Sequence, residues 1–168
     1  MKKHFRNWSA FYKKISLFFN GIVAFSLLPF AWVYLEVEQH PTEPFVEGNM
    51  LIAFQVIVTI VIGLIVFFGH KQFQASIENE EIREMALYEK LSYYFGIAVR
   101  RYMIYEVAAI VCMIAVYFTQ QLVFAVVYLF VLFVFSIARP RYDNVVLHLK
   151  LSKEEKQMLT DDIDLFKD

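Results

Sequence analysis

The sequence predicts an all-α membrane protein: a four-transmembrane-helix bundle made of two helical hairpins, with an amphipathic cytoplasmic helix before the third span. Hydrophobic residues make up 59% of the 168 residues, and the mean hydropathy is +0.49. Soluble domains are nearer half apolar. The apolar residues form long runs without alternating polarity, which excludes half-buried strands and the single stripe of a soluble helix.

Two such runs lie between Met103 and Pro140, interrupted only at Thr119–Gln121. One helix over this stretch would be about 55 Å long at 1.5 Å per residue. Because the hydrocarbon core of a bilayer is only about 30 Å thick, we expect the chain to turn back at Gln120 and Gln121.

The same reasoning divides one domain, residues 1–168, into four spans. The first hairpin has spans at about 15–37 and 50–68, and the second has spans at about 103–118 and 122–138. Each run suits a membrane crossing better than a core helix.

Proline marks two helix irregularities in these spans. Pro29 lies inside the first span and is expected to bend it or interrupt its hydrogen bonds. Pro140 follows Arg139 directly and is expected to stop the fourth helix, because proline disfavours the helical conformation of the residue before it.

Residues 1–14 hold five cations and no acid, with aromatic residues at helical spacing. This pattern fits an interfacial helix on an anionic leaflet. It fits equally well a set of flanking charges with belt aromatics. The aromatic residues concerned are Phe5, Trp8, Phe11 and Tyr12.

Residues 71–102 form the longest polar connection and are expected to be a cytoplasmic or interfacial helix. Ala75–Tyr102 lacks proline and is rich in helix-forming residues. A kink is expected near Gly96, where the helix would enter the bilayer. Its apolar face repeats every three or four residues. The residues of this face are Tyr88, Leu91, Phe95, Ala98 and Tyr102.

The tail, residues 141–168, is predicted to be cytoplasmic. Ser152 and Glu155 have the spacing of a capping box that opens a helix ending near Phe166. Three acids near the end of this helix oppose its dipole, so we expect either marginal stability or a binding partner. These acids are Asp161, Asp162 and Asp164.

All sixteen cations fall within residues 1–14, 70–102 and 139–168, and the two remaining connections hold none. This asymmetry predicts that both termini are cytoplasmic. The small size and short loops favour a bacterial inner membrane.

Glu106 is the one acid inside a predicted span, about one turn from the cytoplasmic boundary. An ionisable group in a span is a candidate functional residue that needs a partner. Arg139, Asn20 and Ser136 are expected at a similar depth and complete a candidate binding cluster. The cluster has two interpretations: an ion or proton site, or a structural Glu106–Arg139 pair, which we favour.

A second polar level is expected near the outer face. Gln120 and Gln121 are interpreted as turn residues, and Gln55 as an interhelical hydrogen-bonding residue. Glu36 marks the outer boundary of the first span. Cys112, the single cysteine, is interpreted as a packing residue.

No catalytic residue, cofactor site or metal site is predicted. The histidines lie outside the spans on both sides, which disfavours a b-type haem. The sequence has no HExxH pattern and no phosphate-binding glycine loop. A net charge of −1 gives no reason to expect a nucleic-acid partner.

We therefore expect a non-enzymatic integral membrane protein, an accessory or scaffolding subunit of a larger membrane complex. Its partners would be the lipid bilayer and other membrane subunits, or further copies of itself, with the tail 152–168 as a docking element. The alternative is a small oligomeric transporter or channel that uses the cluster around Glu106. A membrane-interface lipid enzyme is a second alternative.

Overall fold

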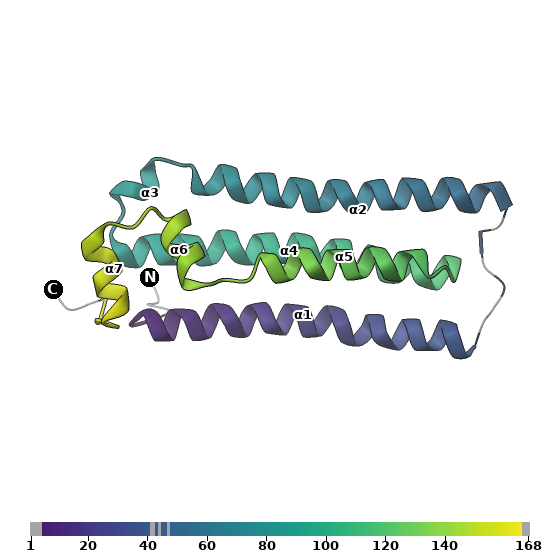
Figure 1. Cartoon of the computed structure of the whole chain (residues 1–168), viewed down its shortest axis with the longest axis horizontal. Coiled ribbons are helices and arrows are strands. Elements are labelled where there is room, and N and C mark those ends of the chain that lie inside the picture. Colours follow the sequence, from purple (N-terminus) through teal and green to yellow (C-terminus); the bar gives the residue numbers. More distant parts are fainter. Residues whose placement is uncertain (1–4, 41–42, 44, 47, 166–168) are drawn as a thin grey trace.

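A computed structural model of the chain describes residues 5–40, 43, 45–46 and 48–165. This part of the chain is helical and contains no strand (Figure 1). Its helices are α1 (Trp8–Gln39), α2 (Gly48–Ile77), α3 (Glu81–Glu84), α4 (Leu87–Thr119), α5 (Val123–Ile137), α6 (Tyr142–His148) and α7 (Lys153–Thr160).

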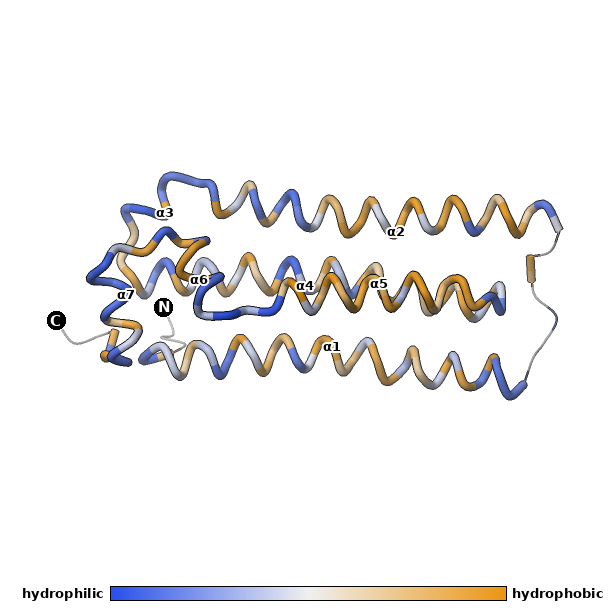
Figure 2. The backbone as a smooth tube through the Cα atoms, viewed as in Figure 1, coloured by the Kyte–Doolittle hydropathy of each residue, from blue (hydrophilic) through white to orange (hydrophobic). Residues whose placement is uncertain are grey.

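Three helices, α1, α2 and α4, are long and apolar enough to cross a membrane. A fourth candidate is α5 taken together with α6, which is bent from it by 74°. The predicted span 122–138 is α5 with its flanking residues, and its length lies at the lower end of the range of about 17–25 residues for a crossing. We therefore treat α5 as the membrane-crossing part of that pair. Figure 2 shows apolar residues along the helices, with hydrophilic residues gathered at both ends.

The helix around which the others pack is α4, which contacts α1, α2 and α5. Figure 1 shows α1 and α2 on opposite sides of α4. The two helices of the predicted first hairpin, α1 and α2, follow each other in the chain, but each packs mainly on α4 and not on the other. Small buried side chains let neighbouring helices approach α4 closely. These are Ala98, Ala108, Ala109, Cys112 and Ala115.

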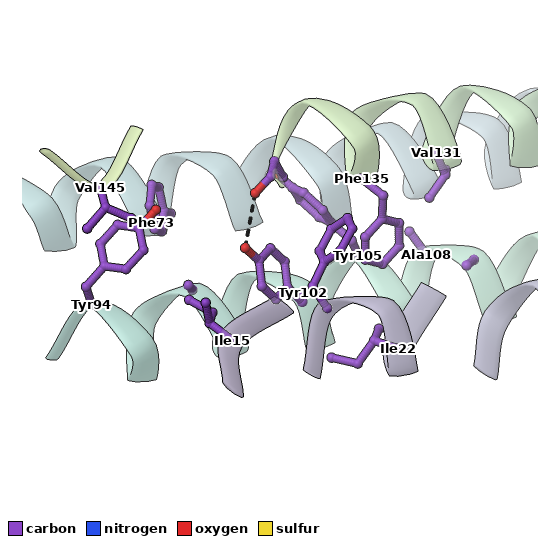
Figure 3. Close-up of a cluster of buried hydrophobic side chains, with 14 of the residues drawn as sticks. Ile15, Ile22, Phe73, Tyr94, Tyr102, Tyr105, Ala108, Val131, Phe135 and Val145 are labelled. Atoms are coloured by element: carbon purple, nitrogen blue, oxygen red, sulfur yellow. Dashed lines mark hydrogen bonds between the residues drawn. The ribbon is translucent and has the colours of Figure 1, made fainter. Parts of the chain in front are cut away.

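Aromatic residues fill the interior between these helices (Figure 3). Tyr128 of α5 stacks on Phe30 of α1, with ring centroids 3.6 Å apart and planes within 3°. The Tyr102 hydroxyl donates a hydrogen bond of 3.1 Å to the carbonyl of Ala138. Buried phenols therefore meet the hydrogen-bonding requirement that accompanies their burial.

The turn predicted at the two glutamines is confirmed. Gln120 has a φ of 54°, the left-handed conformation that glycine usually supplies at helix ends. The buried Thr119 hydroxyl donates to the Ala115 carbonyl at 2.7 Å, and the Phe45 N–H donates to the Phe118 carbonyl at 3.1 Å. These hydrogen bonds stabilise a turn that has neither glycine nor proline.

The single helix predicted over Ala75–Tyr102 is wrong. α2 ends at Ile77, and α4 begins at Leu87. Between them, the Asn79 side chain accepts a hydrogen bond from the Glu81 N–H at 3.1 Å, an interaction that competes with helical pairing.

The third span and the amphipathic segment before it form one helix. α4 continues through Gly96, as expected for an amphipathic helix that runs into the third span. The predicted apolar face is largely confirmed, since Leu91, Ala98 and Tyr102 are fully buried.

The N-terminal segment does not form a separate interfacial helix either. α1 is one helix from Trp8 onward, and the aromatic residues near its start pack inward. The Phe5 ring lies 5.0 Å from the Tyr88 ring, and the Trp8 ring lies 5.5 Å from the Tyr142 ring. Of the five predicted cations, Lys2 and Lys3 lie outside the described residues.

Helices α3, α6 and α7 gather at one end of the bundle, here named the capped end, with the first and last described residues (Figure 1). The opposite end, named the loop end, carries the turn at Gln120. Val145, Leu149 and Leu151 are buried, so the segment after Pro140 packs on the bundle.

The capping box that opens α7 is confirmed. The Glu155 N–H donates to the Ser152 hydroxyl at 3.2 Å, and the Ser152 N–H donates to the Glu155 carboxylate at 2.8 Å. α7 ends at Thr160, earlier than predicted, and the expected end at Phe166 lies outside the described residues.

Candidate functional site

Glu106 lies on α4, where that helix faces α1. Its side chain is almost fully buried, with 5% relative exposure. Neither carboxyl oxygen has a hydrogen-bond partner among the described residues. A buried polar group without a partner is uncommon in proteins and calls for an explanation.

Glu106 lies close to polar groups of two neighbouring helices. It faces Ser26 of α1 and Tyr128 of α5. The Ser26 and Tyr128 hydroxyls are 3.0 Å apart and share a hydrogen bond. On the α5 side, the neighbouring Tyr105 ring lies 5.5 Å from the ring of Phe135, two residues before α5 ends at Ile137.

The other three residues of the predicted cluster do not join Glu106. Asn20, Ser136 and Arg139 are exposed on the outside of their helices. No Glu106–Arg139 ion pair exists among the described residues. The prediction assumed equal depth for residues near the ends of antiparallel spans. It failed because the three side chains lie on exposed faces of their helices. The depths themselves match, since the Tyr105 ring lies 5.5 Å from the Phe135 ring and Arg101 reaches the Ala138 carbonyl.

Glu106 also separates two hollows along the line of contact between α1 and α4, here named the α1–α4 seam. The cap-side hollow has a volume of about 430 Å³ and reaches Leu17 and Met103. The loop-side hollow has a volume of about 250 Å³ and reaches Pro29 and Met113. The residues lining both hollows are Phe25, Glu106 and Ile110.

Pro29 adds a second polar feature to the loop-side hollow. Proline has no N–H, so in a helix the carbonyl four residues earlier loses its usual donor. In α1 that carbonyl belongs to Phe25, and Phe25, Ser26 and Pro29 line the hollow with Glu106. The residues of α1 that line the loop-side hollow therefore include hydrogen-bond acceptors, and they share this hollow with the Glu106 carboxyl group of α4.

Arg101 is a buried cation on α4 that sequence reasoning did not single out. Its guanidinium donates to the Ala138 carbonyl at 2.9 Å and lies 3.7 Å from the centre of the Phe73 ring. It therefore neutralises the C-terminal end of α5, where a cation is favourable, and stacks on an aromatic face. A signal was present, because Arg101 shares the helical face of Tyr94 and Tyr105.

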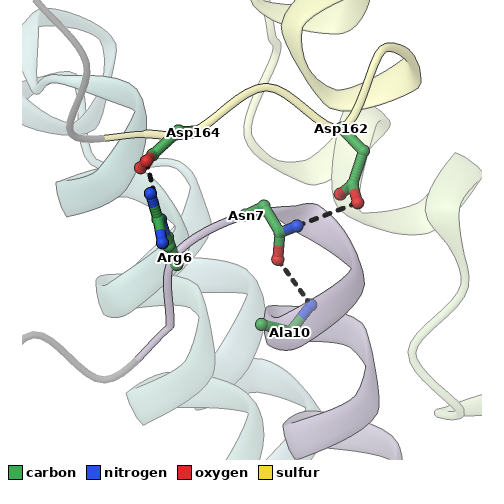
Figure 4. Close-up of polar contacts among 5 residues, drawn as sticks. All are labelled: Arg6, Asn7, Ala10, Asp162 and Asp164. Carbon is green, nitrogen blue, oxygen red and sulfur yellow. Dashed lines mark hydrogen bonds and ion pairs between the residues drawn. The ribbon is translucent and has the colours of Figure 1, made fainter.

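The acidic tail binds the start of α1 (Figure 4). The Asp162 carboxylate accepts hydrogen bonds from the Ser9 N–H at 2.8 Å and the Asn7 side-chain amide at 2.9 Å. The Arg6 guanidinium pairs with Asp164 at 2.7 Å. The expected partner of these acids is thus present within the same chain, at an N-terminus that attracts negative charge.

A second ion pair holds α7 to α4. The Lys90 ammonium lies 2.6 Å from the Glu155 carboxylate, and only 6% of the Lys90 side chain is exposed. Such pairing meets the main requirement for burying a lysine.

His148 packs at the capped end among Phe73, Tyr94 and Arg101. Its ring lies 5.2 Å from Phe73, and its Nδ1 lies 3.4 Å from the Tyr94 hydroxyl. Burial lowers the pKa of His148, and the nearby positive charges of Arg101 and His70 lower it further. The neutral imidazole is therefore the form that fits this packing.

Two further residues, Cys112 and Gln55, are interpreted from the sequence as structural. Cys112 is fully buried, which confirms its interpretation as a packing residue. Within the described part of the chain, no group of three His, Cys, Asp or Glu side chains is arranged to hold a metal ion. The Gln55 side chain has no hydrogen bond there, so its predicted interhelical role is not observed.

Comparisons of the chain with protein-family models, with curated proteins and with solved structures found no match.

Proposed function

We propose that this chain is a non-enzymatic integral membrane protein that serves as an accessory subunit of a larger membrane complex. The observation that supports this proposal is the position of α2. Only 6% of its most apolar stretch is buried, compared with 28% for α1 and 50% for α4. Within that helix, only Ile62, Gly69 and Phe73 are buried.

Grooves flank α2 on both sides. One, of about 720 Å³, lies between α2 and α4 and includes Leu64 and Ile104. The other, of about 270 Å³, lies between α2 and α5 and includes Gly63 and Phe130. Helices in lipid associate by close packing and not by hydrophobic exclusion, so a grooved surface favours a helical neighbour. We propose a transmembrane helix of another subunit as that neighbour.

The proposed location is a bacterial inner membrane, with the capped end in the cytoplasm. The uneven distribution of cations supports this orientation, because the loop-end connections carry no Lys or Arg. The tail already binds its own N-terminus, so α2 replaces residues 152–168 as the proposed docking element.

Photocrosslinking in native membranes tests the proposal. A benzophenone side chain is introduced at Ile57 on α2 or, as a matched control, at Leu129 on α5. The two positions are 61% and 62% exposed. We expect a discrete protein adduct from Ile57 and only lipid adducts from Leu129. Lipid adducts alone at both positions would refute the proposal, and an adduct with a second copy would favour an oligomer instead.

The second candidate function is a small oligomeric transporter or channel. It is favoured by the burial of Glu106 in a helix apolar enough to cross a membrane, since intramembrane acids commonly belong to ion or proton pathways. This candidate predicts that Glu106→Gln abolishes flux across reconstituted vesicles while the helical content is retained. Equal flux in the variant and the parent protein would exclude it.

A further inference from the structure

We propose that Glu106 is a proton-binding site inside the membrane, and that its proton exchanges through the hollows of the α1–α4 seam. The ligand is a proton because each carboxyl oxygen exposes less than 1 Å² of surface. A larger solute does not reach these oxygens. This site is independent of the association proposed for α2.

Electrostatics favour a neutral acid at this position. An isolated carboxylate among apolar side chains lacks both the solvation and the pairing that stabilise its charge. The walls of both hollows are apolar apart from Ser26 and Glu106. The two buried cations of α4 are engaged elsewhere, Arg101 with the Ala138 carbonyl and Lys90 with the Glu155 carboxylate. No described cation forms an ion pair with Glu106.

Hydrogen bonding favours the same form. A protonated carboxyl has an O–H group to donate, and two acceptors lie on the facing wall of α1. The Ser26 hydroxyl oxygen is one, in a residue that lines the loop-side hollow with Glu106. The Phe25 carbonyl is the second, since Pro29 leaves it without its usual helical donor. A carboxylate, by contrast, needs several donors, and the mutual hydrogen bond of the Ser26 and Tyr128 hydroxyls already uses one of their two O–H groups.

Other titratable groups are few around Glu106. Tyr128 of α5 faces it, and Cys112 of α4 lies near Tyr128. The α1 residues lining the two hollows include no titratable side chain. The neutral Tyr128 phenol and the neutral Cys112 thiol carry no charge. Neither side chain therefore stabilises a carboxylate at Glu106 by a charge of its own.

Because the walls of the hollows offer no side-chain relay, the proposed route is water that enters the two hollows. One extends from Glu106 toward the capped end and the other toward the loop end, and both are bounded by Phe25 and Ile110. Glu106 therefore lies where the two spaces meet. A single carboxyl at such a point can exchange its proton toward either side of the seam.

Infrared spectroscopy of the protein in phosphatidylcholine vesicles tests the proposal. At neutral pH we expect a C=O stretch of a protonated carboxyl that shifts in heavy water. This band disappears in Glu106→Gln and remains in Glu36→Gln, a control at an exposed position. If the parent protein lacks the band, the site is ionised and the proposal fails. If the band never shifts in heavy water, exchange through the seam is refuted.

Two further variants keep Glu106 in place, in case Glu106→Gln does not fold. Ser26→Ala removes one acceptor, and Pro29→Ala returns a donor to the Phe25 carbonyl. Each is expected to move the band to higher frequency, because the acid O–H loses a hydrogen-bond partner. A band that is unchanged in both variants would overturn the proposed arrangement.

Discussion

The carboxylate of Asp162 accepts a hydrogen bond of 2.8 Å from the backbone N–H of Ser9. This bond joins the acidic tail to the first turn of α1, whose N–H groups have no partners within the helix. The two ends of the chain thus stabilise each other at the capped end.

Removing the Asp162 side chain is expected to destabilise the start of α1. Asp162→Gly suits this test, because the φ of 51° at this position costs glycine no strain. We expect a loss of about 1 kcal/mol, typical of a helix cap. The control Asp161→Gly removes an exposed carboxylate at a φ of −80°, where glycine costs only added flexibility. Denaturant unfolding in detergent and amide exchange at Ser9 report the difference, and equal losses would contradict the capping role.

Breaking the Lys90–Glu155 pair is expected to loosen α7. We expect Lys90→Met to cost about 2 kcal/mol, less than the roughly 3–5 kcal/mol of a fully buried pair, because 18% of the Glu155 side chain stays exposed. Lys153→Met on exposed α7 surface should change stability by less than about 0.5 kcal/mol. Limited proteolysis of the tail measures the effect. Equal protection in both variants would show that the pair contributes nothing.

Gly69 is expected to be the point where α2 is held to α4. A methyl group there would lie 2.8 Å from the Ile104 Cγ2 and 3.2 Å from the Tyr105 ring. Ile104 is β-branched and cannot yield easily, so Gly69→Ala should cost about 1–3 kcal/mol. Gly63→Ala is the control, because nothing lies within 4 Å of that position. It should gain about 0.5–1 kcal/mol, and equal stability changes would refute the close packing.

His148 is expected to make the capped end sensitive to acid. Its pKa is lowered in the folded protein, so the unfolded chain binds more protons below about pH 6.5, the ordinary histidine value. Stability should therefore be full above that pH and fall as the pH drops toward the folded-state pKa. His148→Phe should remove this part of the pH dependence, whereas His40→Gln at the exposed loop end should keep it. Thermal unfolding as a function of pH provides the measurement.

Local features of the sequence predicted the local structure well. The capping box at Ser152, the turn at Gln120 and the burial of Leu91, Ala98 and Tyr102 follow from spacing and residue type alone. These features depend on neighbours within a few residues, which a single sequence contains.

Tertiary relationships were harder to predict. The pairing of Glu106 with Arg139 depended on which face of each helix turns inward, and Arg139 lies on an exposed face. The burial of Arg101 and the binding of Asp162 to Ser9 depend on how distant segments pack. The central position of α4 could not be read from two consecutive hairpins, because chain order does not state which helices touch.

The account depends most on α1, α2, α4 and α5 crossing a bilayer with the capped end on one side. Single cysteines at Gln121 and Lys150 test this in intact cells with a membrane-impermeant maleimide, and the fully buried Cys112 can stay. We expect immediate labelling at position 121, and labelling at position 150 only after permeabilisation. Labelling of both positions in intact cells, or of position 150 alone, would contradict the account.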